Sequence, residues 1–296
     1  MAIKTPDILV IGAGMYVCGR GTSSLGTVLP TLIQNQKQGL INNINVASTS
    51  QDSIETLRLR LDKMNKVLGT SATVNTYPKH KSHDTTAYKD ALSDISGSSC
   101  AIIVVPDHLH YDITKDVIEA GIHPLVVKPF TASTAEAYDL INLAKLYGVY
   151  GAVEFHKRFD EANLILRQTI RDGTLGDISY ITVEYSQRRV VRDIFKTWED
   201  KTNIFQYLGV HYVDLIYFLT EAYPIRLLAT GQPDQEPPSH TGYDSIQVII
   251  EWKLPKTNRT FISTIVTNWV DPDNTSAVSD QKITVVGTDG RYQADQ

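Results

Sequence analysis

The sequence predicts an α/β fold: an N-terminal doubly wound parallel sheet, followed by a C-terminal α+β domain with a large, mostly antiparallel open sheet. In the first half, short apolar runs alternate with stretches of helical spacing up to about residue 153. This alternation is typical of parallel strands joined by helices that cover both faces of a sheet. After about residue 155, long strand-like runs follow one another with loops between them, which favours antiparallel pairing.

The composition excludes several classes of protein. The chain has 296 residues, 42% of them hydrophobic, and a net charge of −5, so it offers no overall basic charge to nucleic acid or an anionic membrane. No apolar run approaches the roughly 20 residues that span a bilayer. Met1–Pro6 leads directly into a strand and is not a signal peptide, and Cys18 and Cys100 cannot form a disulfide framework. We expect a soluble, cytoplasmic protein without a nucleic-acid partner, a membrane or a metal site.

The first strand, Asp7–Ile11, is followed at once by Gly12-Ala13-Gly14. Two glycines at this spacing after a buried strand allow a tight turn and a close approach of the backbone to a phosphate. Val17 stands where the third glycine of this pattern usually lies, and a plain strand-to-loop turn explains the glycines as well. The candidate contacts to a dinucleotide cofactor here are Gly12, Gly14, Met15 and Tyr16.

The second strand ends at Ser48-Thr49, ahead of a helix over Asp52–Val67. In dinucleotide-binding folds this strand usually ends on an acidic residue that binds the ribose 2′-hydroxyl. Small hydroxyl residues leave room for a 2′-phosphate, and Arg58 and Arg60 follow nearby, which favours NADP over NAD. The alternative for both arginines is an exposed helix face.

Two further strands end in residues that could face a ligand. Cys100–Val105 is stopped by Pro106, and His110 after it either faces the cofactor or covers the start of the next helix. The apolar run that ends at Lys128, directly before a proline, puts a lysine at the carboxyl end of a buried strand, where open parallel sheets bind ligands. A solvated cation at a strand end is the plain alternative.

The second half contains one strongly apolar helix, Ile204–Leu219, with Tyr207 and His211 on it. Before it lies a basic and aromatic segment that contains Lys157 and Arg158. Four basic residues and one aromatic residue also precede the helix, namely Arg188, Arg189, Arg192, Lys196 and Trp198. They favour an anionic substrate, and a solvated basic loop is the alternative. Expected strands are 178–186, 244–252, 260–269 and 281–286.

From about residue 7 to 286, the chain resembles the Gfo/Idh/MocA family of NAD(P)-dependent sugar and polyol oxidoreductases. The resemblance rests on motifs in a fixed order, namely Gly12-Ala13-Gly14, Val105-Pro106-Asp107-His108-Leu109-His110, Val127-Lys128-Pro129, Arg158-Phe159 and Gly209-Val210-His211-Tyr212-Val213-Asp214. It implies an NAD(P)-binding Rossmann domain over 1–130 and a substrate-binding and oligomerisation domain over 131–296. It also implies a homodimer or homotetramer.

The resemblance assigns roles to residues of this chain. Lys128 matches the catalytic lysine of the family and His211 its general acid/base, while Tyr207 stands where many members carry an aspartate. Val127 replaces the glutamate of the lysine motif. The implied cofactor contacts are Gly12, Gly14, Met15, Tyr16, Ser48, Thr49, Pro106, His110 and Lys128, and the implied substrate contacts are Lys128, Lys157, Arg158, Tyr207 and His211.

The predicted function is hydride transfer between a nicotinamide and a carbinol or ketone of a sugar, a sugar derivative or a cyclic polyol. Histidine suits proton transfer in either direction because its pKa lies near neutral pH. A lysine ammonium can stabilise the developing negative charge on the same oxygen. Two alternatives are a non-catalytic NAD(P)-binding regulator and an NAD-dependent glycoside hydrolase.

Overall fold

The computed structural model describes residues 5–95, 99–194, 201–233 and 242–296, and it divides into two compact units, Met1–Glu154 and Phe155–Gln296. The sequence predicted a domain boundary after residue 130, whereas the two units meet after Glu154. The helix and strand that follow residue 130 belong to the first unit, because that strand pairs in parallel with the strand that carries Leu125–Val127.

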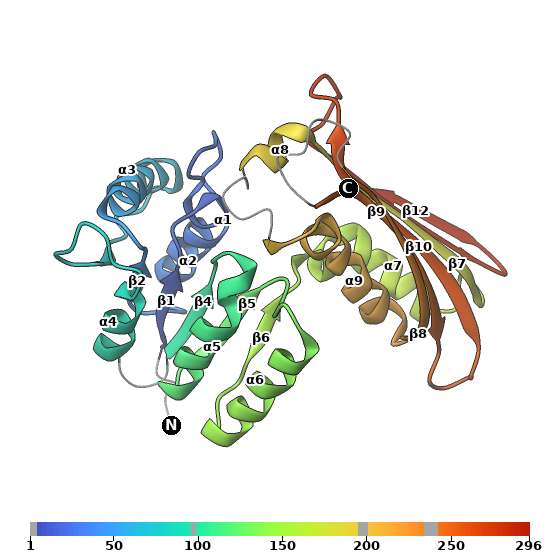
Figure 1. Ribbon diagram of the computed structural model, residues 1–296, viewed down its shortest axis with the longest axis horizontal. Helices are drawn as coiled ribbons and strands as arrows, with labels where there is room; N and C mark the ends of the chain where they lie inside the picture. The colour runs from blue at the N-terminus through green and yellow to red at the C-terminus, as the bar shows by residue number, and fades with distance from the viewer. Residues whose placement is uncertain (1–4, 96–98, 195–200, 234–241) are drawn as a thin grey trace. The chain divides into compact units, whose positions relative to one another are not determined.

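The first unit contains a six-stranded sheet in the order β3-β2-β1-β4-β5-β6 (Figure 1). Every pair of neighbouring strands is parallel, so all six end at the same edge. The strands are β1 (Asp7–Ile11), β2 (Ile44–Ala47), β3 (Val74–Tyr77), β4 (Ser99–Ile103), β5 (His123–Val127) and β6 (Ala152–Glu154). The predicted parallel sheet is therefore confirmed.

Successive residues of β1 pack into different hydrophobic clusters, as side-chain alternation in a strand requires. Ile8 and Val10 join one cluster with residues of the helices that follow β1 and β2, whereas Leu9 and Ile11 join another with residues of the helices that follow β3 and β4. The sheet is thus covered on both faces. The helices of this unit are α1 (Met15–Cys18), α2 (Val28–Lys37), α3 (Gln51–Leu68), α4 (Ala87–Asp94), the 3-10 turn η1 (Asp107–Leu109), α5 (His110–Glu119) and α6 (Thr134–Tyr147).

The second unit contains a six-stranded sheet in the order β12-β11-β7-β10-β9-β8. Its strands are β7 (Ile178–Arg188), β8 (Tyr223–Pro233), β9 (Tyr243–Lys253), β10 (Thr260–Asp271), β11 (Ser279–Gly287) and β12 (Arg291–Asp295). Only β7 and β10 pair in parallel, so the expected mostly antiparallel sheet is confirmed. Strands β8 and β12 were not predicted.

Helices cover one face of this second sheet (Figure 1). The helix residues Leu166 and Leu215 share a cluster with buried strand residues such as Ile181 and Trp252. The predicted apolar helix is divided into a π-helical turn and a regular α-helix. These elements are the 3-10 turn η2 (His156–Phe159), α7 (Glu161–Arg171), α8 (Arg189–Ile194), the π-helical turn η4 (Phe205–Gly209) and α9 (Val210–Thr220).

No helix in the described parts of the chain has the length and apolar character needed to cross a membrane.

Candidate active site

In the turn after β1, Gly12 and Gly14 are glycines for different reasons. Gly12 has a φ of +120°, and a Cβ there would lie 2.0 Å from the carbonyl oxygen of Val104, so a side chain is excluded by the neighbouring backbone. At Gly14, by contrast, a Cβ would meet nothing within 4 Å. The backbone in front of Gly14 is therefore open, as the approach of a pyrophosphate requires. The turn fits a dinucleotide cofactor.

The missing third glycine is explained by the packing of α1. Val17 is fully buried in the core, and α1 ends at Gly19 in the left-handed conformation. The following loop returns to α1, where Gly26 lies so close that a Cβ on it would be 2.6 Å from the Gly19 nitrogen. Arg60 holds this loop by donating to the carbonyl oxygens of Thr22 (2.6 Å) and Ser24 (3.2 Å).

A different arginine lies at the end of β2. Ser50 caps α3 by accepting from the Ser53 amide at 3.3 Å, and Arg20 Nη1 donates to Ser53 Oγ at 2.6 Å. The exposed Arg20 therefore sits beside the hydroxyl-rich segment Ser48–Ser50. Arg58, which the sequence suggested for this role, instead donates to Thr76 Oγ1 at 3.0 Å. Sequence spacing could not identify Arg20 as a neighbour of Ser48–Ser50, because only the folded loop after α1 brings Arg20 beside this segment.

Lys128 follows the last residue of β5 and begins a cis peptide bond with Pro129. Burial lowers the pKa of Lys128 from 10.5 to about 8, while the nearby carboxylates of Asp107 and Glu154 act in the opposite direction. An ammonium with such a pKa is a strong hydrogen-bond donor that also titrates close to neutral pH. This is the kind of perturbed group that active sites use.

His110 has no exposed surface and uses both ring nitrogens within the protein. Nδ1 lies 2.6 Å from the carbonyl oxygen of Pro129, and Nε2 lies 3.0 Å from that of Val105. His110 therefore has a structural role, because both nitrogens bridge the segments that follow β4 and β5, and its expected contact with a cofactor stays a prediction. This bridge fixes the backbone directly after Lys128. Pro106, expected nearby at the cofactor, directly precedes η1.

In the second unit, His211 lies on α9 with only 3% of its surface exposed. Its ring is 4.7 Å from that of His156 and 6.4 Å from that of Tyr185, measured between centroids. Burial raises the pKa of Tyr185 to about 12, so this phenol stays protonated near His211. His156 and Tyr185 were not predicted, because they come from η2 and β7 and only the fold brings them to His211.

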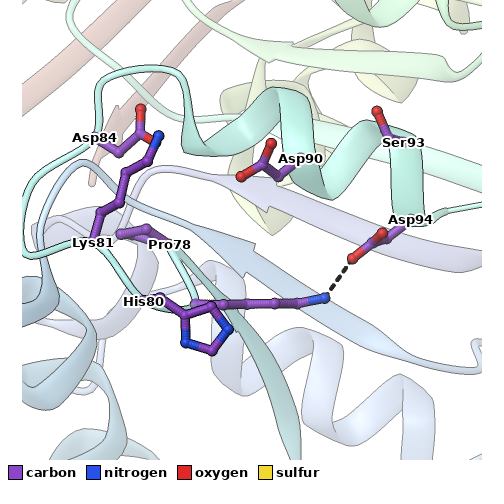
Figure 2. A pocket seen from close by; sticks show the side chains of 8 residues that line it. Pro78, His80, Lys81, Asp84, Asp90, Ser93 and Asp94 are labelled. Carbon is purple, nitrogen blue, oxygen red and sulfur yellow. Dashed lines mark hydrogen bonds and ion pairs between the residues drawn. The ribbon is translucent and has the colours of Figure 1, made fainter.

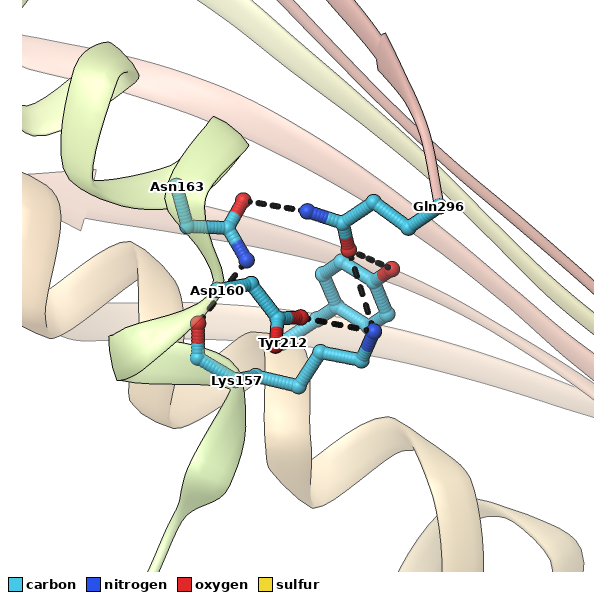
Figure 3. Close-up of polar contacts among 5 residues, drawn as sticks. All are labelled: Lys157, Asp160, Asn163, Tyr212 and Gln296. Atoms are coloured by element: carbon cyan, nitrogen blue, oxygen red, sulfur yellow. Dashed lines mark hydrogen bonds and ion pairs between the residues drawn. The ribbon is translucent and has the colours of Figure 1, made fainter.

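Two residues expected to bind substrate are engaged inside the second unit. Lys157 is 5% exposed and donates to Asp160 Oδ2 at 3.0 Å and to Gln296 Oε1 at 3.1 Å (Figure 3). Arg158 forms a bidentate pair with Asp214 at 2.7 and 2.5 Å. Both cations therefore hold η2 against neighbouring elements, and their expected contact with substrate stays a prediction.

Tyr207 lies in the π-helical turn η4, partly buried against Trp269 with a centroid separation of 6.3 Å. Trp269 Nε1 donates at 2.7 Å to the buried carboxylate of Asp244, which Arg192 also binds at 3.0 and 3.1 Å. Arg192 is thus neutralised within the unit and does not support an anionic substrate. Arg188 likewise bonds to Thr275, Arg189 is exposed, and Lys196 and Trp198 lie outside the described residues.

A polar pocket of about 300 Å³ lies between the loop that follows β3 and helix α4 (Figure 2). Lys79 pairs with Asp94 at 2.6 Å and Lys81 with Asp84 at 2.7 Å, so its charges are largely balanced. Since β3 and β6 are the opposite edges of the first sheet, this pocket is separate from Lys128. No cluster of potential metal ligands occurs among the residues that the structure describes.

Two protein-family models match the chain. The model "Oxidoreductase family, NAD-binding Rossmann fold" matches residues 7–155, and the model "GFO/IDH/MocA C-terminal domain" matches residues 164–293. Together they cover both structural units.

Among curated relatives, the uncharacterized oxidoreductase C26H5.09c of Schizosaccharomyces pombe is 26% identical over 207 residues, covering 69% of this chain and 54% of that protein. The scyllo-inositol 2-dehydrogenase (NADP(+)) IolW of Bacillus subtilis is 32% identical over 117 residues, 38% of this chain and 32% of that protein. The chain therefore spans about half the length of such relatives, or less. Myo-inositol 2-dehydrogenase from Lactobacillus plantarum shares the fold, with a TM-score of 0.73, 17% identity and coverage of 98% and 76% of the two chains.

Proposed function

Because the chain belongs to the Gfo/Idh/MocA family of NAD-binding oxidoreductases, we propose that it interconverts a carbinol and a ketone on a sugar, a sugar derivative or a cyclic polyol. The observation that carries this proposal is Lys128, whose pKa of about 8 marks it as a functional group at the carboxyl edge of a Rossmann sheet. The names of IolW and of the L. plantarum enzyme, both inositol dehydrogenases, support a polyol substrate.

Each polar residue has a role in this reaction. A bound nicotinamide would supply or accept the hydride. The Lys128 ammonium donates to the reacting oxygen and stabilises negative charge on it, and His211 exchanges the hydroxyl proton. Tyr207 orients the substrate, since its phenol can donate a hydrogen bond but cannot replace a carboxylate. The turn at Gly14, with Met15 and Tyr16, holds the pyrophosphate of the cofactor. Lys128 also borders the cofactor.

We further propose that the cofactor is NADP, bound at its 2′-phosphate by Arg20 together with Ser48 and Thr49. The position of Arg20 beside Ser53, without an acidic residue among Ser48–Ser50, supports this choice. The expected effect of Arg20→Ala is about tenfold weaker NADPH binding with unchanged NADH binding, measured by quenching of protein fluorescence. Arg58→Ala is the matched control and should change neither affinity, whereas equal losses for both cofactors in Arg20→Ala would contradict the assignment.

The reaction itself is tested by mixing the protein with NADP(H) or NAD(H) and a panel of inositols, sugars and uronates. The proposal predicts a change of nicotinamide absorbance with at least one member of the panel. Tight cofactor binding without turnover on any of them would instead favour a non-catalytic regulator. Release of sugar from an aryl glycoside without net change in the nicotinamide would favour glycoside hydrolysis.

A further inference from the structure

A carboxylate from the neighbouring strand accompanies Lys128. In the parallel pairing of β5 and β6, Glu154 lies opposite Val127, the residue directly before Lys128. Glu154 is also the last residue of β6, so both side chains emerge at the same edge of the sheet. The sequence alone does not reveal this pairing, because the whole of α6 lies between residues 128 and 154.

The Glu154 carboxylate is held by the cofactor turn. Tyr16, which follows Gly14 in α1, donates its hydroxyl to Glu154 Oε1 at 3.2 Å. Burial and the Glu154 charge raise the pKa of Tyr16 well above its usual value, so this hydroxyl stays a donor over the whole working range of pH. The carboxylate beside Lys128 is therefore fixed by a residue of the turn that the cofactor would occupy.

A second carboxylate of the first unit also acts on Lys128. Asp107 of η1 is 9% exposed and favours the charged lysine more strongly than Glu154 does. His110 is committed to the carbonyl oxygens of Pro129 and Val105. Burial disfavours the ammonium and the two carboxylates favour it, so the charge of Lys128 near neutral pH depends on both of them.

We propose that Glu154, held by the Tyr16 hydroxyl, is a positioning residue that keeps Lys128 protonated and oriented at the edge of the sheet. Its benefit to catalysis rests on the proposed function, whereas the coupling of the two charges is a property of the folded chain alone. The arrangement links the cofactor turn to the charge of the lysine through the Tyr16–Glu154 hydrogen bond and the electrostatic attraction between Glu154 and Lys128.

The test is the pH dependence of Lys128 acetylation by trace acetic anhydride, followed by mass spectrometry in the absence of cofactor and substrate. In the unaltered chain the midpoint is expected near the Lys128 pKa of about 8. Glu154→Gln should lower this midpoint by about one pH unit, since an opposite charge nearby typically raises a lysine pKa by that amount or more. Glu154→Asp keeps the charge and should stay close to the unaltered chain.

Glu119→Gln is the matched control, because it removes the same charge from an exposed residue at the last position of α5. The proposal is overturned if Glu154→Gln titrates like the unaltered chain, or if Glu119→Gln shifts the midpoint equally. Should Glu154→Gln not fold, Tyr16→Phe tests the same arrangement, because it removes the hydrogen bond that holds the Glu154 carboxylate. The acetylation midpoint of Lys128 must then shift, and an unchanged midpoint overturns the proposal.

These results separate the inference from the proposed function. A shifted acetylation midpoint in a chain that turns over no substrate would support the coupling and reject the oxidoreductase. In an active enzyme, the fall of kcat/KM at alkaline pH should move to lower pH in Glu154→Gln by the same amount as the acetylation midpoint. A fall in kcat alone, with both midpoints unchanged, would indicate a structural effect and would also overturn the inference.

Discussion

Lys128 combines two properties that oppose each other at the scale of one residue. Its position makes it available to a ligand, but burial makes its charge costly, as its lowered pKa records. Between pH 8 and 10.5 the unfolded chain binds more protons at this residue than the folded chain does, so the stability contributed by this site rises with pH across that window. Below pH 8 the folded protein carries the full cost of a buried ammonium.

We therefore expect Lys128→Met to raise the free energy of unfolding at pH 7 by roughly 1–3 kcal/mol while it abolishes turnover. Urea unfolding at pH 7 and at pH 10.5 measures the effect, and the gain should shrink at the higher pH. If Lys128→Met were less stable than the unaltered chain at pH 7, this would contradict the claim that burial of the Lys128 ammonium is costly.

His211 is the residue that we propose transfers the substrate proton. Its buried ring lies among His156, Phe155 and Tyr185, and Asn can fill part of that space without titrating. His211→Asn is expected to reduce kcat by about 10²–10⁴-fold with little change in cofactor affinity. His123→Asn is a suitable control, since His123 lies at the first position of β5, at the other end of that strand from Lys128. Equal turnover in His211→Asn and in the unaltered chain would exclude proton transfer by His211.

At the scale of elements, the glycine turn after β1 offers a matched pair of variants. Gly12→Ala places a Cβ against the Val104 carbonyl oxygen at a φ of +120°, and it should cost about 2 kcal/mol or more of stability. Gly14→Ala meets no protein atom within 4 Å and should leave the melting temperature unchanged. The same methyl group would occupy the space proposed for the pyrophosphate, so NADPH binding should weaken at least tenfold. Normal NADPH affinity in Gly14→Ala would contradict the assignment of this turn.

The elements that the sequence predicted correctly are those with strong periodicity or clear caps. The helix expected over Asp52–Val67 lies within α3, and the strands expected over 178–186 and 260–269 lie within β7 and β10. Helix α3 begins one residue earlier than expected because Ser50, and not Asp52, caps it. The missed strands carry weak signals: β8 is exposed along its whole length and β12 is a short polar segment.

The site was predictable only where a residue follows directly from a motif. Lys128 and the glycine turn could be proposed from strand ends and spacing. Glu154 required the register of β5 with β6, and Arg20 required the folded loop after α1. The charges of Lys157 and Arg158 suggested a ligand, and they alone did not indicate the ion pairs that these residues form with Asp160 and Asp214.

At the scale of the whole molecule, the exposed face of the second sheet is the candidate for self-association. Leu228 lies opposite Ile249, and Ile262 lies opposite Tyr180, so all four project from one face. Their exposed fractions are 69%, 45%, 48% and 42%, which is high for large apolar side chains. Contiguous apolar surface of this kind marks interaction sites. We expect a homodimer or homotetramer formed through this face.

Leu228→Glu combined with Ile249→Glu should convert the oligomer to monomers in light scattering coupled to size-exclusion chromatography. Leu146→Glu, at an exposed leucine of α6 in the other unit, is the control and should leave the mass unchanged. An unaltered protein that is monomeric at micromolar concentration would contradict the expectation.

We propose above all that Lys128 serves the chemical step of a nicotinamide-dependent oxidoreductase. The most direct test compares Lys128→Ala with Lys66→Ala, an exposed lysine on α3, using the best substrate of the panel and saturating cofactor. We predict that Lys128→Ala still binds NADPH but loses at least about 10²-fold in kcat, while Lys66→Ala retains full turnover. Undiminished turnover in Lys128→Ala would contradict the claim.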